Sequence, residues 1–388
     1  MWKNAVIYHI FIDRFAGYYA RKDDEKPHWV GGNLRGIIKK LPYLKTLGVT
    51  AIWLSPVYKG AAYHGYLVTD FYQVDPHFGT KNDLKKLVKT CHRFRMKVVV
   101  DYVPNHCSST HSFFRDAQKN RKSVYRDWFV FTRWPDSYLC FLQVKELPKL
   151  NLENKETREY IIQNALYWLE KFNLDGMRLD HAIGPSHGFW REFRKRIKAK
   201  RKDTLLLGEV WFQGVKTRDI KTFNMEGVRR VWRFGRSRGI NARQDAAMTS
   251  YVDILDGCLD FTFNRLIKEW LGRGRISEGT FWKKIKQHYR QFPKHFLLPT
   301  FLDNHDMNRF LFDVKGDKRK LKKATEAQFS INQPKIIYYG TEVGMSQKKD
   351  MKKFKSHGDL QARKKMVWDL SKQDTHLLKF YRNLISQH

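Results

Sequence analysis

Three carboxylates, Asp180, Glu209 and Asp306, each stand close after a short apolar stretch of the chain, and His106 and His305 occupy similar places. A single buried carboxylate at the end of a strand can be a structural hydrogen-bond acceptor. Several carboxylates that converge on one site repel one another and cost stability, which proteins accept mainly at functional sites. These residues are therefore the first candidates for chemistry.

Paired carboxylates, with no thiol nucleophile and no obvious metal cage, suggest glycoside hydrolysis. That reaction needs one ionised carboxylate at the sugar carbon and a second, protonated carboxyl that gives a proton to the leaving oxygen. Arg178 precedes Asp180 by two residues, so both would lie on one face of a strand, and Arg178 would hold Asp180 ionised. Glu209, followed by Val210 and Trp211, is the better candidate for a raised pKa.

Short apolar runs alternate with helical periodicity, which predicts the elements that position these residues. The predicted strands cover Val6–Phe11, Val49–Leu54, Lys97–Tyr102, Gly176–Leu179, Leu205–Val210, Cys258–Phe263, Phe296–Phe301 and Lys335–Tyr339. The predicted helices include Leu34–Leu47, Leu84–Phe94, Arg158–Phe172, Phe189–Lys198, Thr325–Ile331 and Thr375–Ile385. Eight such alternations favour an α/β fold, a (β/α)8 TIM barrel, over the competing doubly wound sheet. In a barrel, chemistry gathers at the carboxyl ends of the strands.

One connection is too long for a plain loop. About fifty residues lie between Pro104 and Glu153, so we expect a short inserted subdomain after the third strand. The predicted organisation is a first barrel part over 1–103, the insert over 104–153 and a second barrel part over 154–388. Because the last predicted helix ends near His388, we expect no C-terminal β-sandwich.

Composition limits the class of protein further. The 388 residues are 42% hydrophobic and 29% charged, which is typical of a globular chain and not of a disordered one. The formal net charge of +35 is the unusual feature of this composition. The charge makes a polyanion a candidate partner, although the basic residues are spread along the chain as solvated helix faces would be. No apolar run is long enough for a membrane span, and the four cysteines form no CxxC pair, which argues against zinc. The N-terminus lacks a signal peptide pattern, so we expect a cytoplasmic protein, or a secreted one whose signal was removed.

Six motifs then resemble, in order, the conserved regions of the α-amylase family of glycoside hydrolases, family 13. They are Asp101–His106, Leu147–Asn151, Gly176–Asp180, Gly208–Trp211, Phe301–Asp306 and Tyr338–Glu342. The resemblance covers nearly the whole chain, and six motifs in order are far more specific than any one of them. The second motif, LPKLN, is similar to that of neopullulanase and cyclomaltodextrinase members.

The resemblance implies a retaining mechanism with three catalytic carboxylates. Asp180 would be the nucleophile, Glu209 the general acid and then the general base, and Asp306 the residue that stabilises the distorted transition state. For such a pair we expect the carboxyl groups of Asp180 and Glu209 to lie about 5–5.5 Å apart.

The resemblance also implies substrate-binding residues. His106 and His305 would bind sugar hydroxyls, and Tyr66 would stack under the sugar with His64 beside it. Arg178 would set the charge of the nucleophile. Further candidates on the substrate side are His181 and Trp211.

The chain departs from the family after the nucleophile. It reads His181-Ala182-Ile183-Gly184, where typical α-amylases carry a Lys-His pair whose His helps to hold calcium, and neopullulanases carry Asn-Glu. No cofactor is needed for the chemistry. Calcium stays open, because Asn105 matches the position of a calcium ligand.

Our first hypothesis is a hydrolase of α-1,4-glucosidic bonds in starch-derived oligosaccharides, cyclodextrins or soluble glucans, which could also transglycosylate. An α-glucosidase or glucanotransferase on other α-glucosides is the nearest alternative. A different class is an inactive barrel that binds polyanions or sugars. The expected partner is an α-glucan oligosaccharide, without a membrane or a specific nucleic acid, and the protein would be a monomer or a homodimer.

Overall fold

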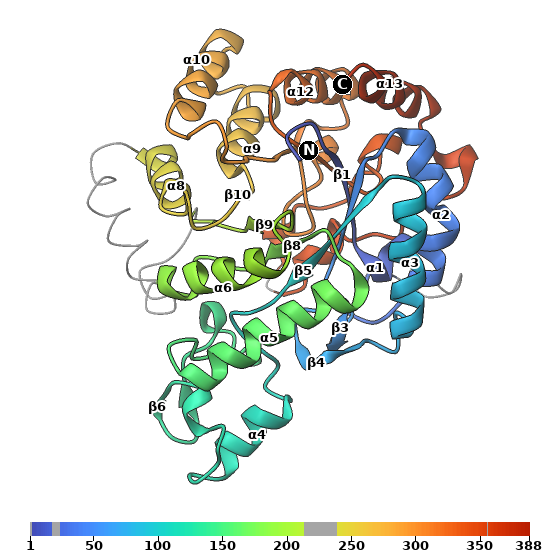
Figure 1. Cartoon of the computed structure of the whole chain (residues 1–388). Helices are drawn as coiled ribbons and strands as arrows, with labels where there is room; N and C mark the ends of the chain where they lie inside the picture. The colour runs from blue at the N-terminus through green and yellow to red at the C-terminus, as the bar shows by residue number, and fades with distance from the viewer. Residues whose placement is uncertain (1, 18–23, 213–238, 355) are drawn as a thin grey trace. The chain divides into compact units, whose positions relative to one another are not determined.

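Short parallel strands alternate with helices along the described chain (Figure 1). The structure, a computed structural model, describes residues 2–17, 24–212, 239–354 and 356–388. These residues divide into two units. The first unit comprises Met1–Ser55, His77–Val98 and Leu259–His388, and the second comprises Pro56–Pro76 and Val99–Cys258.

The first unit contains four parallel strands in the order β2-β1-β12-β11. They are β1 (Val6–Ile10), β2 (Ala51–Leu54), β11 (Thr300–Phe301) and β12 (Lys335–Tyr338). Every residue of these strands is buried. The helices are α1 (Ile12–Phe15), α2 (Leu34–Leu47), α3 (Lys81–Arg93), α9 (Phe261–Ile267), the π-helical η4 (Lys268–Gly272), α10 (Glu278–Tyr289), α11 (Phe310–Asp313), α12 (Lys318–Ser330) and α13 (Thr375–Ser386).

The second unit contains four parallel strands in the order β5-β8-β9-β10. They are β5 (Lys97–Tyr102), which enters this unit at Val99, β8 (Gly176–Leu179), β9 (Leu205–Gly208) and β10 (Gly257–Cys258). An antiparallel hairpin pairs β3 (Tyr58–Gly60) with β4 (Val68–Val74). The helices α5 (Lys155–Phe172) and α6 (His187–Lys200) contact each other, and α8 covers Gly239–Thr249 (Figure 1).

The segment predicted as an inserted subdomain follows β5 and contains short elements only. They are α4 (Ser112–Lys119), η1 (Arg126–Trp128), β6 (Phe131–Arg133), β7 (Ser137–Tyr138) and η2 (Phe141–Gln143). Aromatic side chains pack it together, with Phe114 against both Phe129 and Tyr138. The limits of this segment as a separate domain stay a prediction.

Polar caps fix where the helices begin. Asn33 accepts a hydrogen bond from the Gly36 amide at the start of α2, and Ser186 accepts one from the Phe189 amide at the start of α6. Such caps satisfy backbone donors that have no partner within the helix. The cap at Ser186 ends the loop that follows Asp180, so it limits how far that loop can extend.

Two predicted strands were mostly wrong. Instead of a strand over Cys258–Phe263, β10 ends at Cys258 and α9 begins at Phe261, because the Asp260 side chain caps the helix by accepting from the Phe263 amide. A short apolar run fits a buried strand and a buried helix equally well. The predicted strand over Phe296–Phe301 is reduced to β11, since Pro299 has no N–H to donate to a ladder.

Candidate active site

Arg178 lies at the centre of a cluster of charges in the second unit. Its Nη1 donates to Asp101 Oδ1 at 2.6 Å and to Asp180 Oδ1 at 2.8 Å, and its Nη2 lies 2.7 Å from Glu209 Oε1. The side chains of Arg178 and Asp101 are fully buried, whereas Asp180 and Glu209 keep 10% and 15% of their surface exposed. One guanidinium therefore serves three carboxylates, and the two predicted catalytic ones are those that solvent can reach.

The register of the parallel strands builds this cluster. Asp101 in β5 pairs with Arg178 in β8, and Arg178 pairs in turn with Leu207 in β9. The ladder continues past the strand ends, because the Asp180 amide donates to the Tyr102 carbonyl at 2.8 Å and the Glu209 amide to the Leu179 carbonyl at 3.0 Å. Asp180 and Glu209 are thus held by backbone hydrogen bonds as well as by Arg178.

The cluster contains three carboxyl groups and one cation, so one of the carboxyl groups can hold a proton. The pKa of Arg178 lies well above its usual value: burial lowers it most, but the attraction of Asp101, Glu209 and the other anionic groups outweighs burial. Burial raises the pKa of Asp101 to about 6, although Arg178 and the Tyr66 hydroxyl act in the other direction. Three carboxyl groups beside one cation repel each other when all are ionised, so uptake of one proton relieves the repulsion.

Glu209 is also held by His181, the residue that follows Asp180. The His181 amide donates to Glu209 Oε2 at 3.0 Å, and the Ala182 amide donates to the Glu209 carbonyl at 3.0 Å. His181 adopts a left-handed conformation with φ of 43°, which is uncommon for a residue with a side chain. His181 therefore takes part in the site through its backbone amide. The sequence predicted His181 only as a residue on the substrate side, and its neighbours in the chain do not indicate this hydrogen bond.

Tyr66 and His64 lie beside this cluster. The Tyr66 hydroxyl donates to Asp101 Oδ2 at 2.8 Å, and the Tyr66 amide donates to His64 Nδ1 at 3.1 Å. The two rings are nearly parallel, with centroids 5.8 Å apart, and both residues are half-buried. Gly65 between them has φ of 80°, and a Cβ there would lie 2.6 Å from the Pro56 carbonyl oxygen, so the turn requires glycine.

His106 and His181 are buried, and the rings of both lie against Phe141. The ring centroids of His106 and His181 lie 5.1 Å and 4.7 Å from that of Phe141. Burial lowers the pKa of His106 to about 3, and burial also lowers the pKa of His181 well below its usual value. Both imidazoles are therefore neutral near neutral pH and can serve as hydrogen-bonding groups.

We expect acidification to destabilise the protein through His106. The unfolded chain gains a proton at this residue below about pH 6.5, whereas the folded chain gains it only near pH 3. In that window stability falls with decreasing pH, by about 1.4 kcal/mol per pH unit for one such group. Urea unfolding at pH 7 and pH 5 measures the loss, which should be smaller in His106→Asn. The exposed His295→Asn serves as the control, and equal losses in the wild type and His106→Asn would contradict this assignment.

Trp211, the remaining candidate in the second unit, lies two residues beyond Glu209 and is half-buried. Gln244 in α8 fixes the backbone on both sides of it. Gln244 Nε2 donates to the Val210 carbonyl at 2.6 Å, and Gln244 Oε1 accepts from the Phe212 amide at 2.9 Å. The segment after the proposed acid/base is thus anchored to a helix, but the role of the Trp211 side chain stays a prediction.

The first unit holds the other predicted residues, His305 and Asp306. His305 is buried and its Nε2 lies 3.1 Å from Asp306 Oδ2, while the Asp306 side chain is 45% exposed. Arg363 Nη2 lies 2.9 Å from Asp306 Oδ1, and Arg363 Nε donates to the His305 carbonyl at 2.9 Å. Arg363 was not predicted as a site residue, and only its place in a family-like loop before Trp368 could have indicated it.

Trp368 itself has a structural role. Its Nε1 donates to the Phe15 carbonyl at 2.6 Å, and its ring packs edge-on against Phe15 and Tyr43. Lys40 Nζ lies 4.1 Å from the centre of the ring. This tryptophan therefore fastens its loop to other parts of the first unit.

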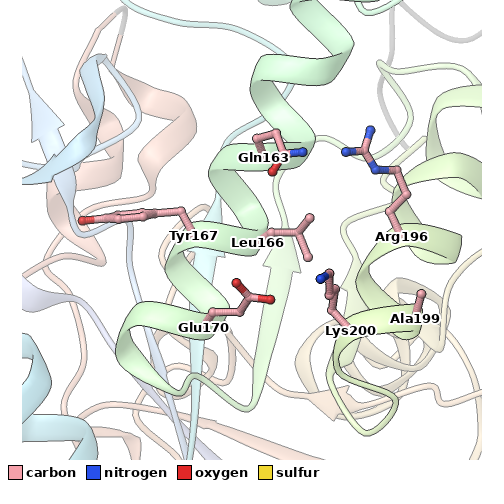
Figure 2. Close-up of a pocket in the computed structure, with 7 residues that line it drawn as sticks. All are labelled: Gln163, Leu166, Tyr167, Glu170, Arg196, Ala199 and Lys200. Carbon is pink, nitrogen blue, oxygen red and sulfur yellow. The ribbon is translucent and has the colours of Figure 1, made fainter.

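A groove of about 510 Å³ lies on helices α5 and α6 (Figure 2). It is lined by Gln163, Leu166, Tyr167, Glu170, Arg196, Ala199 and Lys200. Arg196 also pairs with Glu159 on α5, with Nη2 2.8 Å from Oε1. None of the predicted site residues lines this groove, so it does not alter the assignment.

Comparison with known proteins identifies the fold first. A solved structure of cyclic α-maltosyl-(1→6)-maltose hydrolase from Arthrobacter globiformis superposes with a TM-score of 0.82 at 26% identity, over 99% of this chain and 82% of that one. The family model described as the catalytic domain of alpha amylase matches residues 9–377. The prediction of a (β/α)8 barrel is confirmed.

The chain belongs to the α-amylase family. It is 37% identical to Alpha-amylase 2 of Dictyoglomus thermophilum and 32% identical to a cyclomaltodextrinase of Geobacillus thermopakistaniensis, in each case over 99% of this chain. The chain spans 63% and 62% of the lengths of these two relatives. Within the residues that the structure describes, no helix has the length and apolar character needed to cross a membrane.

Proposed function

We propose that the protein is a retaining glycoside hydrolase that cleaves α-1,4-glucosidic bonds in starch-derived oligosaccharides, cyclodextrins or soluble glucans. The observation that carries the proposal is the arrangement at Arg178, which contacts both Asp180 and Glu209 while each keeps part of its surface exposed. A retaining glycosidase needs two such carboxyl groups with different protonation states at one sugar.

In the first step, Asp180 attacks the anomeric carbon as a carboxylate and forms a glycosyl ester. The bond from that carbon to the leaving oxygen breaks, and Glu209 gives its proton to this oxygen. The contact between Arg178 Nη1 and Asp180 Oδ1 favours the ionised nucleophile. The negative charges of Asp180 and Asp101 favour the proton on Glu209.

In the second step the ester changes that balance. Once Asp180 is esterified it carries no charge, and the positive charge of Arg178 then favours the ionised form of Glu209. The His181 amide supports the same form, because it donates to Glu209 Oε2. Glu209 takes a proton from water, which attacks the sugar carbon and releases Asp180. A sugar hydroxyl in place of water gives transglycosylation.

The remaining roles come from the family resemblance. Asp306 would stabilise the distorted sugar ring through its hydroxyls, supported by its contacts with His305 and Arg363. Tyr66, whose hydroxyl donates to Asp101, would stack under the sugar. His106 is neutral and buried, as a hydroxyl-binding imidazole would be.

The substrate class rests on the relatives. Their names include α-amylase, cyclomaltodextrinase and cyclic α-maltosyl-(1→6)-maltose hydrolase, which all act on α-linked glucose polymers or rings. The departure from the family after Asp180 falls on the side where a leaving-group sugar would bind, so chain-length preference should differ from that of typical α-amylases.

Product analysis tests the proposal. The protein is incubated with maltooligosaccharides, β-cyclodextrin and pullulan, and the anomeric form of the first product is followed by proton NMR. We expect shorter products that first appear as α-anomers and are absent with Asp180→Asn. Products that first appear as β-anomers would contradict a retaining mechanism, and no turnover of any of the three would contradict the substrate class.

A further inference from the structure

The calcium site that the family resemblance implies does not fit the residues present. Calcium takes six to eight oxygen ligands, usually including carboxylates. Within the described ranges, no group of three or more His, Cys, Asp or Glu side chains could hold a metal ion. At the position of the implied ligand, Asn105 turns its Nδ2 toward His106 Nδ1 at 3.2 Å, and its Oδ1 accepts no hydrogen bond from the part of the chain described.

A lysine side chain reaches the loop that follows Asp180. Lys149 Nζ donates to the Gly184 carbonyl at 3.0 Å. Gly184 lies in the run after Asp180 from which the Lys-His pair of typical family members is absent. Lys149 is half-buried, and burial lowers the pKa of its ammonium to about 8.

The backbone places Lys149 beside Asn105. The Leu150 amide donates to the Asn105 carbonyl at 2.9 Å, and the Cys107 amide donates to the Pro148 carbonyl at 3.2 Å. His106 and Lys149 are paired directly in this short antiparallel bridge. The backbone of Lys149 therefore lies next to the Asn105 loop, and its ammonium lies at the loop that follows Asp180.

Gly184 closes the arrangement from the other side. A Cβ at this residue would lie 2.0 Å from Asn105 Oδ1 and 2.7 Å from the His181 ring, so only glycine allows the backbone to come this close. Gly184 thus lies against the Asn105 side chain and also accepts the hydrogen bond from the Lys149 ammonium. The Glu153 carboxylate attracts the Lys149 ammonium, and Glu153 is itself paired with Arg158 at 3.0 Å.

We propose that the Lys149 ammonium is a built-in cation that replaces the structural calcium, so that the protein needs no metal. It links the 148–151 segment to the loop that carries Asp180 and His181, and its charge repels a divalent ion from the Gly184 carbonyl. Lys149 is a positioning residue, because it acts on the catalytic carboxylates only through the backbone of that loop.

Thermal unfolding with and without metal tests this inference independently of activity. For the wild type we expect the melting temperature to agree within about 1 °C in EDTA and in excess calcium, since an ion that does not bind cannot stabilise. Mass spectrometry of the purified protein should find no bound calcium. A drop in melting temperature in EDTA that calcium but not magnesium reverses would overturn the proposal.

Variants at Lys149 test the link itself. Lys149→Met should lower the melting temperature by about 2–5 °C, because the Gly184 carbonyl loses its donor. Lys149→Asp supplies a carboxylate in place of the cation, so its melting temperature should be low in EDTA and should rise with calcium. Lys145→Met and Lys145→Asp, at an exposed lysine four residues earlier in the chain, are the matched controls. Equal melting temperatures for Lys149→Met and Lys145→Met would refute the role of the contact between Lys149 and Gly184. If Lys149→Asp does not fold, the melting temperatures of the wild type in EDTA and in calcium decide the question.

Discussion

Replacing Asp180 by glycine is expected to lower kcat for maltotriose hydrolysis by at least about 10⁴-fold, because the covalent step loses its nucleophile. The geometry gives the reason for so large an effect. Asp180 is the carboxylate that Arg178 Nη1 holds at 2.8 Å while 10% of its side chain stays exposed. Initial rates by product chromatography measure the loss, and circular dichroism verifies that the variant is folded.

Azide distinguishes two explanations for the lost activity of Asp180→Gly, the loss of the nucleophile and the distortion of the site. The glycine variant leaves a gap on the face of the sugar that Asp180 would attack, and azide can enter it. An α-linked substrate should then yield a β-glycosyl azide, with partial recovery of rate. The exposed Asp203→Gly in the same unit should keep wild-type activity and form no azide product. An α-glycosyl azide from Asp180→Gly, or activity near that of the wild type, would show that another group is the nucleophile.

The strands were predictable where the local sequence pattern fits a strand and no other element. β5 and β8 begin and end as predicted, because β-branched and apolar residues are bounded there by turn residues. The run after Cys258 has two readings, and the Asp260 cap that decides between them is a hydrogen bond rather than a pattern. The hairpin of β3 and β4 was not predicted, since its register is irregular and its alternation is therefore weak.

The site was predictable to the extent that its contacts are local. Arg178 and Asp180 are two residues apart on one strand, so their contact follows from strand geometry. The role of Asp101 was not predicted, because it depends on the register between β5 and β8 and on Tyr66 35 residues away. Arg363 contacts Asp306 across 57 residues, and no spacing rule connects them.

Lys149 shows why a motif can be read correctly and still be incomplete. LPKLN indicated a branch of the family, yet nothing in its five letters shows that the lysine ends at the Gly184 carbonyl. The glycine was seen only as a departure from the family. The fold brings Lys149 and Gly184 into contact although they are 35 residues apart in the chain. The sequence alone could not connect them.

Replacing Glu209 by alanine should produce a loss that depends on the leaving group. With maltotriose we expect kcat to fall by about 10²–10⁴-fold, since no proton reaches the departing oxygen. With α-maltosyl fluoride the leaving group needs little protonation, so the first step should proceed almost as in the wild type. The glycosyl ester should then accumulate, because Glu209 is also the base for the second step. Stopped-flow release of fluoride measures the first step, and mass spectrometry of the quenched enzyme detects the ester.

Azide again distinguishes the role, now with the opposite stereochemistry. It needs no general base, so it should resolve the accumulated ester of Glu209→Ala and give an α-glycosyl azide, with retention. These expected products follow from the contacts of Glu209. Glu209 and Asp180 both contact Arg178, and Glu209 accepts a hydrogen bond from the amide of His181, the residue after Asp180. Glu170→Ala, at an exposed carboxylate on α5, is the matched control and should hydrolyse both substrates at the wild-type rate. An equal loss on maltotriose and on the fluoride would mean that Glu209 supports the fold of the site and transfers no proton.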